Sequence, residues 1–328
     1  MKCLRMSSSL DEVVRRLAKK VRRHPRSLLT WFDDAGAIEF DGHYILIKVD
    51  GFAASRALYP WCTYEDFGFR GITAAVSDVV AKGCRPYIYA ISIGVKPEHV
   101  QYVEEIMNGI DEAVKEYGGY VENVDTNVGY DTWIDVFVIG ECKYLPIPRR
   151  AKALDRIILP RKVGLSTMGY IDYTMGRIPE LDDVRSFTCR PKADIRIVDA
   201  LERYRSCIDG SIDVSDTLLE SMQQLSDVND VGIYIYEDPS RILNPLADMY
   251  SRAMGMDPQY IALASNEEYI PLIIVKPSYE DEVLNALRVL GKEPISVGVI
   301  TSDKDIRWSG RRVPKVIWNY VSGRIEPT

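Results

Sequence analysis

Aspartates recur in this sequence at the ends of predicted strands and near the starts of predicted helices. The series comprises Asp33, Asp34, Asp50, Asp78, Asp125, Asp213 and Asp216. Carboxylate oxygens are the ligands that Mg²⁺ prefers, and protein-bound Mg²⁺ commonly also holds substrate phosphates. The spacing leaves two interpretations open. The aspartates either share a magnesium site or serve as separate caps of turns and helices.

Asp78 is the member of this series that is hardest to explain as a cap. It lies inside the apolar stretch AAVSDVVA, where basic residues are scarce nearby. An unpaired buried carboxylate costs several kcal/mol, and a shared divalent cation would remove that cost. We therefore expect five carboxylates to converge and bind Mg²⁺. They are Asp33, Asp34, Asp50, Asp78 and Asp125.

Standard nucleotide and hydrolase motifs are absent. The sequence contains no GxxxxGK[ST], no GxGxxG after a predicted strand, no GxSxG and no HRD or DFG. Its three histidines form no HExxH, which argues against a zinc hydrolase. The six cysteines are scattered without CxxC spacing, so we expect neither a zinc ribbon nor a disulfide scaffold.

The elements that must position the aspartates alternate along the chain. Asp41-Gly42 joins the runs AIEF and HYILIKVD, and this dipeptide predicts a two-residue hairpin. Asp50 would close the second strand. We then expect a helix at 65–83, a strand at PYIYAISIGV, a long helix from Pro97 and strands at GYVENVDT and WIDVFVIGEC. This order predicts an α/β (α+β) fold.

The 328 residues suggest two domains. Prolines and cations in PIPRRAK mark a boundary, which gives domains 1–148 and 149–328. The second domain should contain strands GIYIY, YIPLIIVK and ISVGVIT, with helices near 194–207, 215–226, 240–254 and 280–290. No run of about 18 apolar residues occurs, and no apolar leader core is visible near the N-terminus. We therefore expect a cytoplasmic protein without a membrane span.

The charge of the chain is uneven. Residues 1–30 carry a net charge of +7, whereas the whole chain carries −7. The acidic body argues against general nucleic-acid binding. A basic helix predicted at residues 10–26 leaves nucleic acid or a membrane surface as a weaker alternative partner, because a solvated helix face is the commoner outcome.

Eight segments, in order, resemble the superfamily of aminoimidazole-ribonucleotide (AIR) synthetase and thiamine-monophosphate kinase, and resemble the kinase branch most. The segments span about residues 30 to 276. They are FDDAG, IKVDGF, GFRGITAAVSDVVAKGCRP, YGGYVENVDTN, WIDVFVIGE, AKALDRIIL, CIDGSIDVSDTLLESM and SNEEYIPLIIV.

The resemblance implies a two-domain AIR-synthase-like fold, whose N-terminal sheet pairs with a second copy into a dimeric β-barrel. It also implies an ATP-dependent phosphotransferase or synthetase that acts on an oxygen of a small molecule and uses ATP and Mg²⁺. The implied metal ligands are the five aspartates above; the implied cofactor contacts are Asn123, Asp125, Thr126 and Ser77; and the implied catalytic residues are Asp213 and Asp216. Trp308, Trp318 and Tyr320 would lie near the acceptor, or else pack in the C-terminal core.

The sequence departs from the family at glycines. Asn123-Val124 replaces a glycine pair, Thr217 replaces a single glycine, and Ser265-Asn266 replaces a pair in the kinase branch. Glycine permits positive φ and close approach of the backbone to phosphate. The acidic residues are retained while these glycines are lost. This favours an alternative function, in which a degenerate member binds nucleotide or metal without turnover, as a regulatory or complex-forming subunit.

Overall fold

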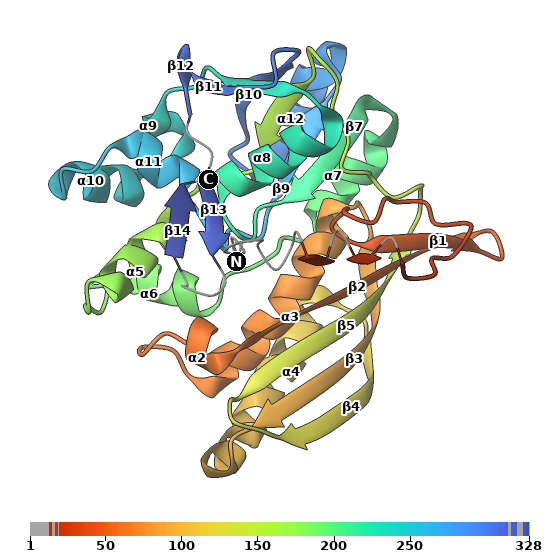
Figure 1. Ribbon diagram of the computed structural model, residues 1–328, viewed down its shortest axis with the longest axis vertical. Helices are drawn as coiled ribbons and strands as arrows, with labels where there is room; N and C mark the ends of the chain where they lie inside the picture. Colours follow the sequence, from red (N-terminus) through yellow and green to blue (C-terminus); the bar gives the residue numbers. More distant parts are fainter. Residues whose placement is uncertain (1–12, 15–16, 19, 314–315, 320–323, 328) are drawn as a thin grey trace, which may run out of the picture.

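The computed structural model describes residues 13–14, 17–18, 20–313, 316–319 and 324–327. Two sheets dominate the fold, and the N-terminal sheet lies below the C-terminal half of the chain in Figure 1. This arrangement confirms a mixed α/β fold. None of the helices in the described part of the chain is both long and apolar enough to cross a membrane.

The N-terminal sheet has five strands in the order β1-β2-β5-β3-β4. Only the β3–β4 pair is parallel among these neighbours. The strands are β1 (Gly36–Phe40), β2 (His43–Ala53), β3 (Arg85–Val95), β4 (Tyr120–Val128) and β5 (Trp133–Cys142). The sheet is open, and the described residues form no closed barrel within one chain.

The predicted hairpin is confirmed. Asp41 and Gly42 have φ values of 50° and 79°, as a turn with two left-handed residues requires, and Phe40 pairs with His43. The predicted end of the second strand is wrong, because β2 continues through Asp50 to Ala53 and pairs with β5 along this whole stretch.

One face of the N-terminal sheet is covered by two helices, α3 (Tyr64–Ala81) and α4 (Val103–Tyr117). They approach closely through glycines: a Cβ on Gly68 would lie 2.1 Å from the Ile106 carbonyl oxygen. Gly109 faces the Glu65 carbonyl in the same way. The helix expected from Pro97 begins instead as a 3₁₀ turn, η1 (Pro97–Tyr102), and α2 (Ala54–Ala57) follows β2 directly.

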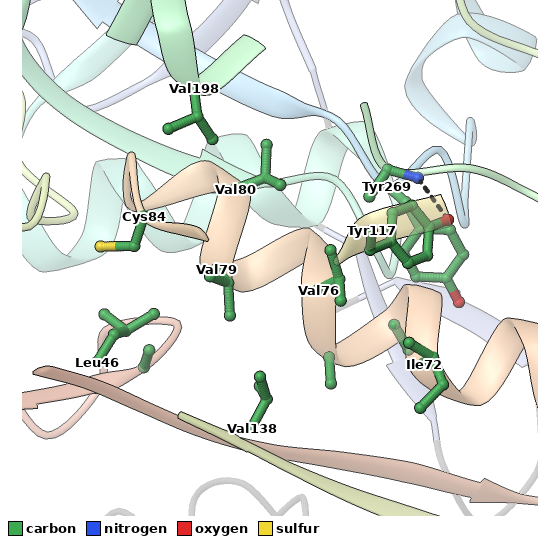
Figure 2. Close-up of a cluster of buried hydrophobic side chains, with 14 of the residues drawn as sticks. Leu46, Ile72, Val76, Val79, Val80, Cys84, Tyr117, Val138, Val198 and Tyr269 are labelled. Atoms are coloured by element: carbon green, nitrogen blue, oxygen red, sulfur yellow. Dashed lines mark hydrogen bonds between the residues drawn. The ribbon is translucent and has the colours of Figure 1, made fainter. Parts of the chain in front are cut away.

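Helix α3 is the central element of the molecule. It begins with a capping box between Thr63 and Asp66, and every residue from 67 to 81 is buried. One side packs on β2 and β5, and the other contacts strands of the second sheet. Figure 2 shows Val79 directed towards Leu46 and Val138 of the N-terminal sheet, with Val80 on the side of Val198. Polar residues on α3 are therefore enclosed between the two sheets.

The second sheet has seven strands in the order β12-β11-β8-β10-β6-β9-β7, and only β8 and β11 pair in parallel. Its strands are β6 (Arg156–Leu159), β7 (Ile208–Asp213), β8 (Gly232–Ile235), β9 (Pro271–Val275), β10 (Ile295–Thr301), β11 (Ile306–Trp308) and β12 (Arg311–Arg312). A separate ribbon joins β13 (Val316–Asn319) to β14 (Arg324–Pro327).

The helices of this half are mostly short. They are α5 (Leu165–Thr174), α6 (Asp182–Cys189), α7 (Ile197–Arg203), η2 (Arg205–Cys207), α8 (Leu218–Asn229), α9 (Pro239–Ile242), α10 (Pro245–Ala253), α11 (Pro258–Leu263), η3 (Pro277–Tyr279) and α12 (Glu280–Val289). A single helix at 240–254 is a wrong prediction. Pro245 cannot donate a backbone hydrogen bond, and it starts α10 with Asn244 as the N-cap.

Along the chain, the strands of the first sheet end before residue 143 and those of the second begin after residue 155. The predicted boundary at 148 lies between them. The hydrophobic core, however, is shared, because Ile158, Val198 and Ile273 belong to the same buried cluster as α3. The division into two domains therefore stays a prediction.

Two disulfides correct the expectation from cysteine spacing. Cys62 bonds Cys189, and Cys84 bonds Cys142, at sequence separations of 127 and 58. Neither pair is visible from local spacing, because only the folded chain brings the partners together. Cys207 is buried and free.

Candidate active site

A cavity of about 950 Å³ lies between the two halves of the chain. The N-terminal half contributes β2, α3 and the turn that contains Asp33 and Asp34. The C-terminal half contributes α5, the end of β7, the start of α8 and the segment 264–269. The cavity has the size of a small-molecule site.

Three buried carboxylates meet in the lining of this cavity. Oxygens of Asp34, Asp78 and Asp213 lie within 4.8 Å of one another. Asp78 comes from the middle of α3, and Asp213 is the last residue of β7. The Ser77 hydroxyl donates a hydrogen bond to Asp213 Oδ2 at 3.2 Å. Asp33 and Asp50 join these three through shared cations, and we call the five residues the carboxylate cluster.

The Asp33–Asp34 side of the cluster is neutralised by two cations. The Lys82 ammonium lies 2.6 Å from a carboxylate oxygen of each residue, and its side chain is fully buried. The Arg149 guanidinium contacts Asp34, and the Arg149 backbone N–H donates to Asp33 at 2.9 Å. Burial alone would raise the pKa of Asp34, but Lys82 and Arg149 lower it to about 2.

On the other side of the cluster lies the cation Lys48. Its ammonium lies 2.7 Å from Asp78 Oδ2 and 3.2 Å from Asp50 Oδ2. Lys48 and Asp50 share a face because side chains two apart on a strand point the same way. Burial alone would lower the pKa of Lys48, but Asp78 and Asp50 raise it well above its usual value. Lys48 is therefore a permanent positive charge in the cavity.

Negative charge remains in excess beside Lys48. Burial raises the pKa of Asp213 to about 6, with a further contribution from the charge of Asp34. Burial and Asp213 together raise the pKa of Asp78 well above its usual value. These two carboxylates resist being ionised together, because each is buried and each repels the other.

The donor set fits a divalent cation. Within the described part of the chain, these five carboxylates form ion pairs with three cations, Lys48, Lys82 and Arg149, so two negative charges in this set remain uncompensated when every group is ionised. All of the donors are oxygens, which suits Mg²⁺ rather than a softer metal. The excess charge lies at Asp78 and Asp213, where the pKa values are raised.

The structure brings together most of the residues expected at the site. Asp33, Asp34, Asp50, Asp78, Asp213 and Asp216 line the cavity, and Ser77 adjoins it through Asp213. Neither Asp213 nor Asp216 caps α8, since Thr217 is the N-cap. The cap interpretation is therefore wrong for this pair.

Asn123, Asp125 and Thr126 do not line the cavity. They lie on β4, the exposed edge strand, where Asp125 accepts a hydrogen bond from Asn127. Strands β3 and β5 separate β4 from β2, which carries Asp50. Within one chain, Asp125 is thus apart from the carboxylate cluster, contrary to the expected convergence of all five residues.

Sequence reasoning missed the cations that neutralise the cluster. Lys48 precedes Asp50 by two residues on β2, a spacing that was readable as a pairing signal. Lys82 is the C-cap of α3 and pairs with Asp33 and Asp34, which only the folded chain brings near it. The structure also distinguishes two arginines: Arg149 lines the cavity, whereas the Arg150 guanidinium contacts Asp209.

Part of the cavity wall is aromatic. Tyr59 stacks on Trp61 with ring centroids 4.9 Å apart, and Tyr173 meets Tyr59 edge to face at 5.3 Å. Arg70 lies over the rings of Tyr59 and Phe52 and bonds Glu267, which lines the cavity. A planar ring could bind against this wall.

The tryptophan expected near the acceptor packs elsewhere. Trp308 is buried in the C-terminal core, and its indole N–H donates to the Glu237 carbonyl at 3.1 Å. The core-packing alternative therefore holds for Trp308. The Trp318 side chain and Tyr320 lie outside the described residues.

The replaced glycines cause no backbone strain. Val124, Thr217, Ser265 and Asn266 are all absent from the residues with positive φ. The left-handed residues of segment 265–269 are Glu267 and Tyr269, with φ values of 50° and 49°. Arg70 bonds Glu267 and so supports this segment beside the cavity.

Comparison with known proteins gives consistent matches. Residues 32–142 match the family model of the AIR synthase related protein, N-terminal domain. The chain is 26% identical over 316 residues to a thiamine-monophosphate kinase of Pyrococcus horikoshii, covering 95% of this chain and 96% of that protein.

Solved structures share the fold. A protein from Thermus thermophilus superposes with a TM-score of 0.85 at 24% identity, covering 96% of this chain and 100% of that one. The AaThiL protein, solved as a complex with AMPPCP and TMP, gives a TM-score of 0.80 at 21% identity and covers 95% and 96%. Both relations extend over nearly the whole of each chain.

Proposed function

Because this chain belongs to the superfamily of AIR synthase-related proteins and resembles its thiamine-monophosphate kinase branch, we propose that it is a Mg²⁺-dependent kinase that transfers the γ-phosphoryl group of ATP to a small molecule. The P–O bond to the terminal phosphorus of ATP breaks, and a P–O bond to an acceptor oxygen forms. ADP leaves with the electron pair of the broken bond.

The observation that carries this proposal is the carboxylate cluster with its two uncompensated charges. Asp78 and Asp213, with Asp50 beside them, would hold Mg²⁺, which neutralises phosphate charge when it is bound. The chain's own contribution is positioning, because phosphoryl transfer needs alignment and charge neutralisation more than covalent chemistry. Asp216 and Arg149 line the same cavity and would orient the reacting groups.

The aromatic wall of the cavity supports an acceptor with a planar ring. Tyr59 and Tyr173 line the cavity and would contact such a ring. Named relatives are thiamine-monophosphate kinases, and AaThiL was solved with TMP. We therefore propose thiamine monophosphate as the first acceptor to test, with its phosphate oxygen as the nucleophile.

Turnover tests this proposal directly. With ATP, Mg²⁺ and thiamine monophosphate, we expect stoichiometric ADP and thiamine diphosphate by phosphorus NMR, and no product with EDTA. Asp78→Asn should lower kcat by about 100-fold or more, because one charge-stabilising group is removed. The exposed Asp111→Asn variant should keep the wild-type kcat, since Asp111 pairs with Lys115 on the surface of α4 and does not line the cavity. ATP consumption that is independent of Mg²⁺ would contradict the mechanism.

A second candidate is a protein that binds nucleotide without turnover. The observation in its favour is that Lys48 and Lys82 lie between the carboxylates that would otherwise bind metal. Nucleotide binding in calorimetry without product from a range of phosphorylated acceptors would favour this function.

The N-terminal sheet supports a proposed homodimer. Its outer face, opposite to Lys48, exposes apolar surface such as Val49, which is 63% exposed. Edge strand β4 is exposed along its whole length. A second copy could cover this face and complete a barrel, and β4 with Asn123, Asp125 and Thr126 would then lie in the interface.

Sedimentation velocity should therefore give the mass of a dimer at micromolar concentration. Val49→Lys should shift the protein towards monomer, because Val49 is on the outer face, opposite to Lys48. A matched Val289→Lys change on α12, where the valine is 85% exposed, should leave the mass unchanged. A wild-type monomer would argue against this assembly.

A further inference from the structure

Lys48 and Lys82 differ in what their ammonium groups can still bind. The Lys82 side chain is fully buried and contacts Asp33, Asp34 and the Ser211 carbonyl oxygen, the last at 2.9 Å. Oxygens of these three residues surround the ammonium, and the side chain has no exposed surface. Lys82 is thus a structural counter-charge that a ligand in the cavity does not reach.

Lys48, by contrast, faces the cavity. Among the described residues its ammonium contacts two carboxylates, Asp50 and Asp78, which leaves one of its three N–H groups available. The side chain keeps 16% of its surface accessible and lines the cavity. Lys48 therefore can bind a ligand that enters the cavity without losing either ion pair.

The position of Lys48 is also one that a bridging metal ion would need. A divalent cation between Asp50 and Asp78 would bind the same oxygens that the ammonium contacts at 3.2 and 2.7 Å. Both cannot occupy this place, because the Mg²⁺–oxygen distance of about 2.0–2.1 Å requires direct contact. The ammonium is covalently part of β2, whereas a metal ion must bind from solution.

We propose that Lys48 is a built-in cation of the phosphate site. It takes the place of one divalent ion between Asp50 and Asp78, limits the nucleotide-free cluster to a single divalent ion, and donates its remaining N–H to a phosphate oxygen of the nucleotide. The inference rests on the proposed use of Mg²⁺ and ATP. The charge balance agrees with it, since the cluster has two negative charges in excess with Lys48 and three without it.

The ordinary alternative is that Lys48 only stabilises the fold as an ion pair. That alternative predicts a change in thermal stability when Lys48 is replaced, with no change in the number of bound metal ions. Counting the ions therefore separates the two interpretations, and Lys48→Met and Lys48→Arg form a matched pair that removes or retains the charge. Lys115→Met, on the exposed surface of α4, is the control.

The first measurement is Mn²⁺ titration of the full chain without nucleotide, followed by electron paramagnetic resonance. We expect one tightly bound Mn²⁺ per wild-type chain. Lys48→Met should bind a second ion, or bind the first at least about tenfold more tightly, because a repelling charge a few ångströms away is removed. Lys48→Arg and Lys115→Met should match the wild type. Two tight ions in the wild type, or unchanged binding in Lys48→Met, would overturn the inference.

The second measurement is calorimetric binding of AMPPCP in EDTA. Lys48→Met should bind at least about tenfold more weakly than the wild type, and Lys48→Arg should retain most of the affinity. Equal affinities would refute the phosphate contact.

If Lys48→Met does not fold, the wild-type ion count and the Lys48→Arg affinity still decide. A wild type that binds no Mn²⁺ at all would refute the proposed magnesium dependence itself, which is a different result from unchanged binding in the variant.

Discussion

In metal-free buffer at pH 8, the Asp213→Asn protein is expected to be more stable than the wild type by up to about 3 kcal/mol. Burial raises the pKa of Asp213 from its ordinary 3.8 to about 6. At pH 8 the native protein must ionise this group against burial and the charge of Asp34. The uncharged amide avoids this cost, and its oxygen can still accept the hydrogen bond from Ser77.

The pH dependence follows from the same shift. Between about pH 4 and 6 the native state binds a proton at Asp213 that the unfolded chain does not, so wild-type stability increases as the pH falls through this range. The contribution is lost above pH 6, and Asp213→Asn should not show it. Urea denaturation in EDTA at pH 4.5 and pH 8 measures both effects, with the surface variant Asp111→Asn as the control.

With added Mg²⁺, the wild type should become more stable than Asp213→Asn. The wild type gains stability from a ligand that binds only its native state, whereas Asp213→Asn has lost one of the proposed ligands. A variant that is less stable than the wild type at pH 8 in EDTA would show that Lys48 compensates Asp213 fully. The excess negative charge, and the metal site inferred from it, would then be wrong.

Features set by local chemistry could be predicted from the sequence. The Asp41-Gly42 turn needs two left-handed residues, and few other dipeptides supply them. Helix α3 has its own capping box and an apolar pattern. The aspartates of the cavity were found because Asp78 is a charged residue among alanines and valines, which is unusual without a compensating partner.

Features set by long-range pairing could not be predicted in this way. Lys82 neutralises Asp33 across 49 positions, and the partner of Cys62 lies 127 residues away. Trp308 packs in a core whose members come from several distant strands. In the sequence, Asp125 resembles the other carboxylates that follow predicted strands. Its strand, β4, lies at the edge of the sheet, and the order of strands in a sheet cannot be predicted from local sequence.

The Cys62–Cys189 disulfide joins the two halves of the chain beside the aromatic wall of the cavity. Cys62 follows the stacked Tyr59 and Trp61, and Cys189 ends α6. The Trp61 indole N–H donates to the Thr188 hydroxyl at 3.0 Å, so the same junction also has a non-covalent contact. The bridge therefore both closes a long loop and holds Tyr59 in place.

Cys62→Ser is expected to lower the free energy of unfolding by about 4–5 kcal/mol, the loop-entropy value for a loop of more than 100 residues. The loosened wall should raise the KM for the ring-bearing acceptor more than the KM for ATP, because the proposed phosphate contacts come from the carboxylate cluster and Lys48 rather than from the aromatic wall. Urea denaturation of oxidised protein and steady-state kinetics measure the two effects. Cys207→Ser, which removes a buried but free thiol, controls for loss of packing. A loss below about 1 kcal/mol, or equal changes in both KM values, would mean that the Trp61–Thr188 contact alone fixes the wall.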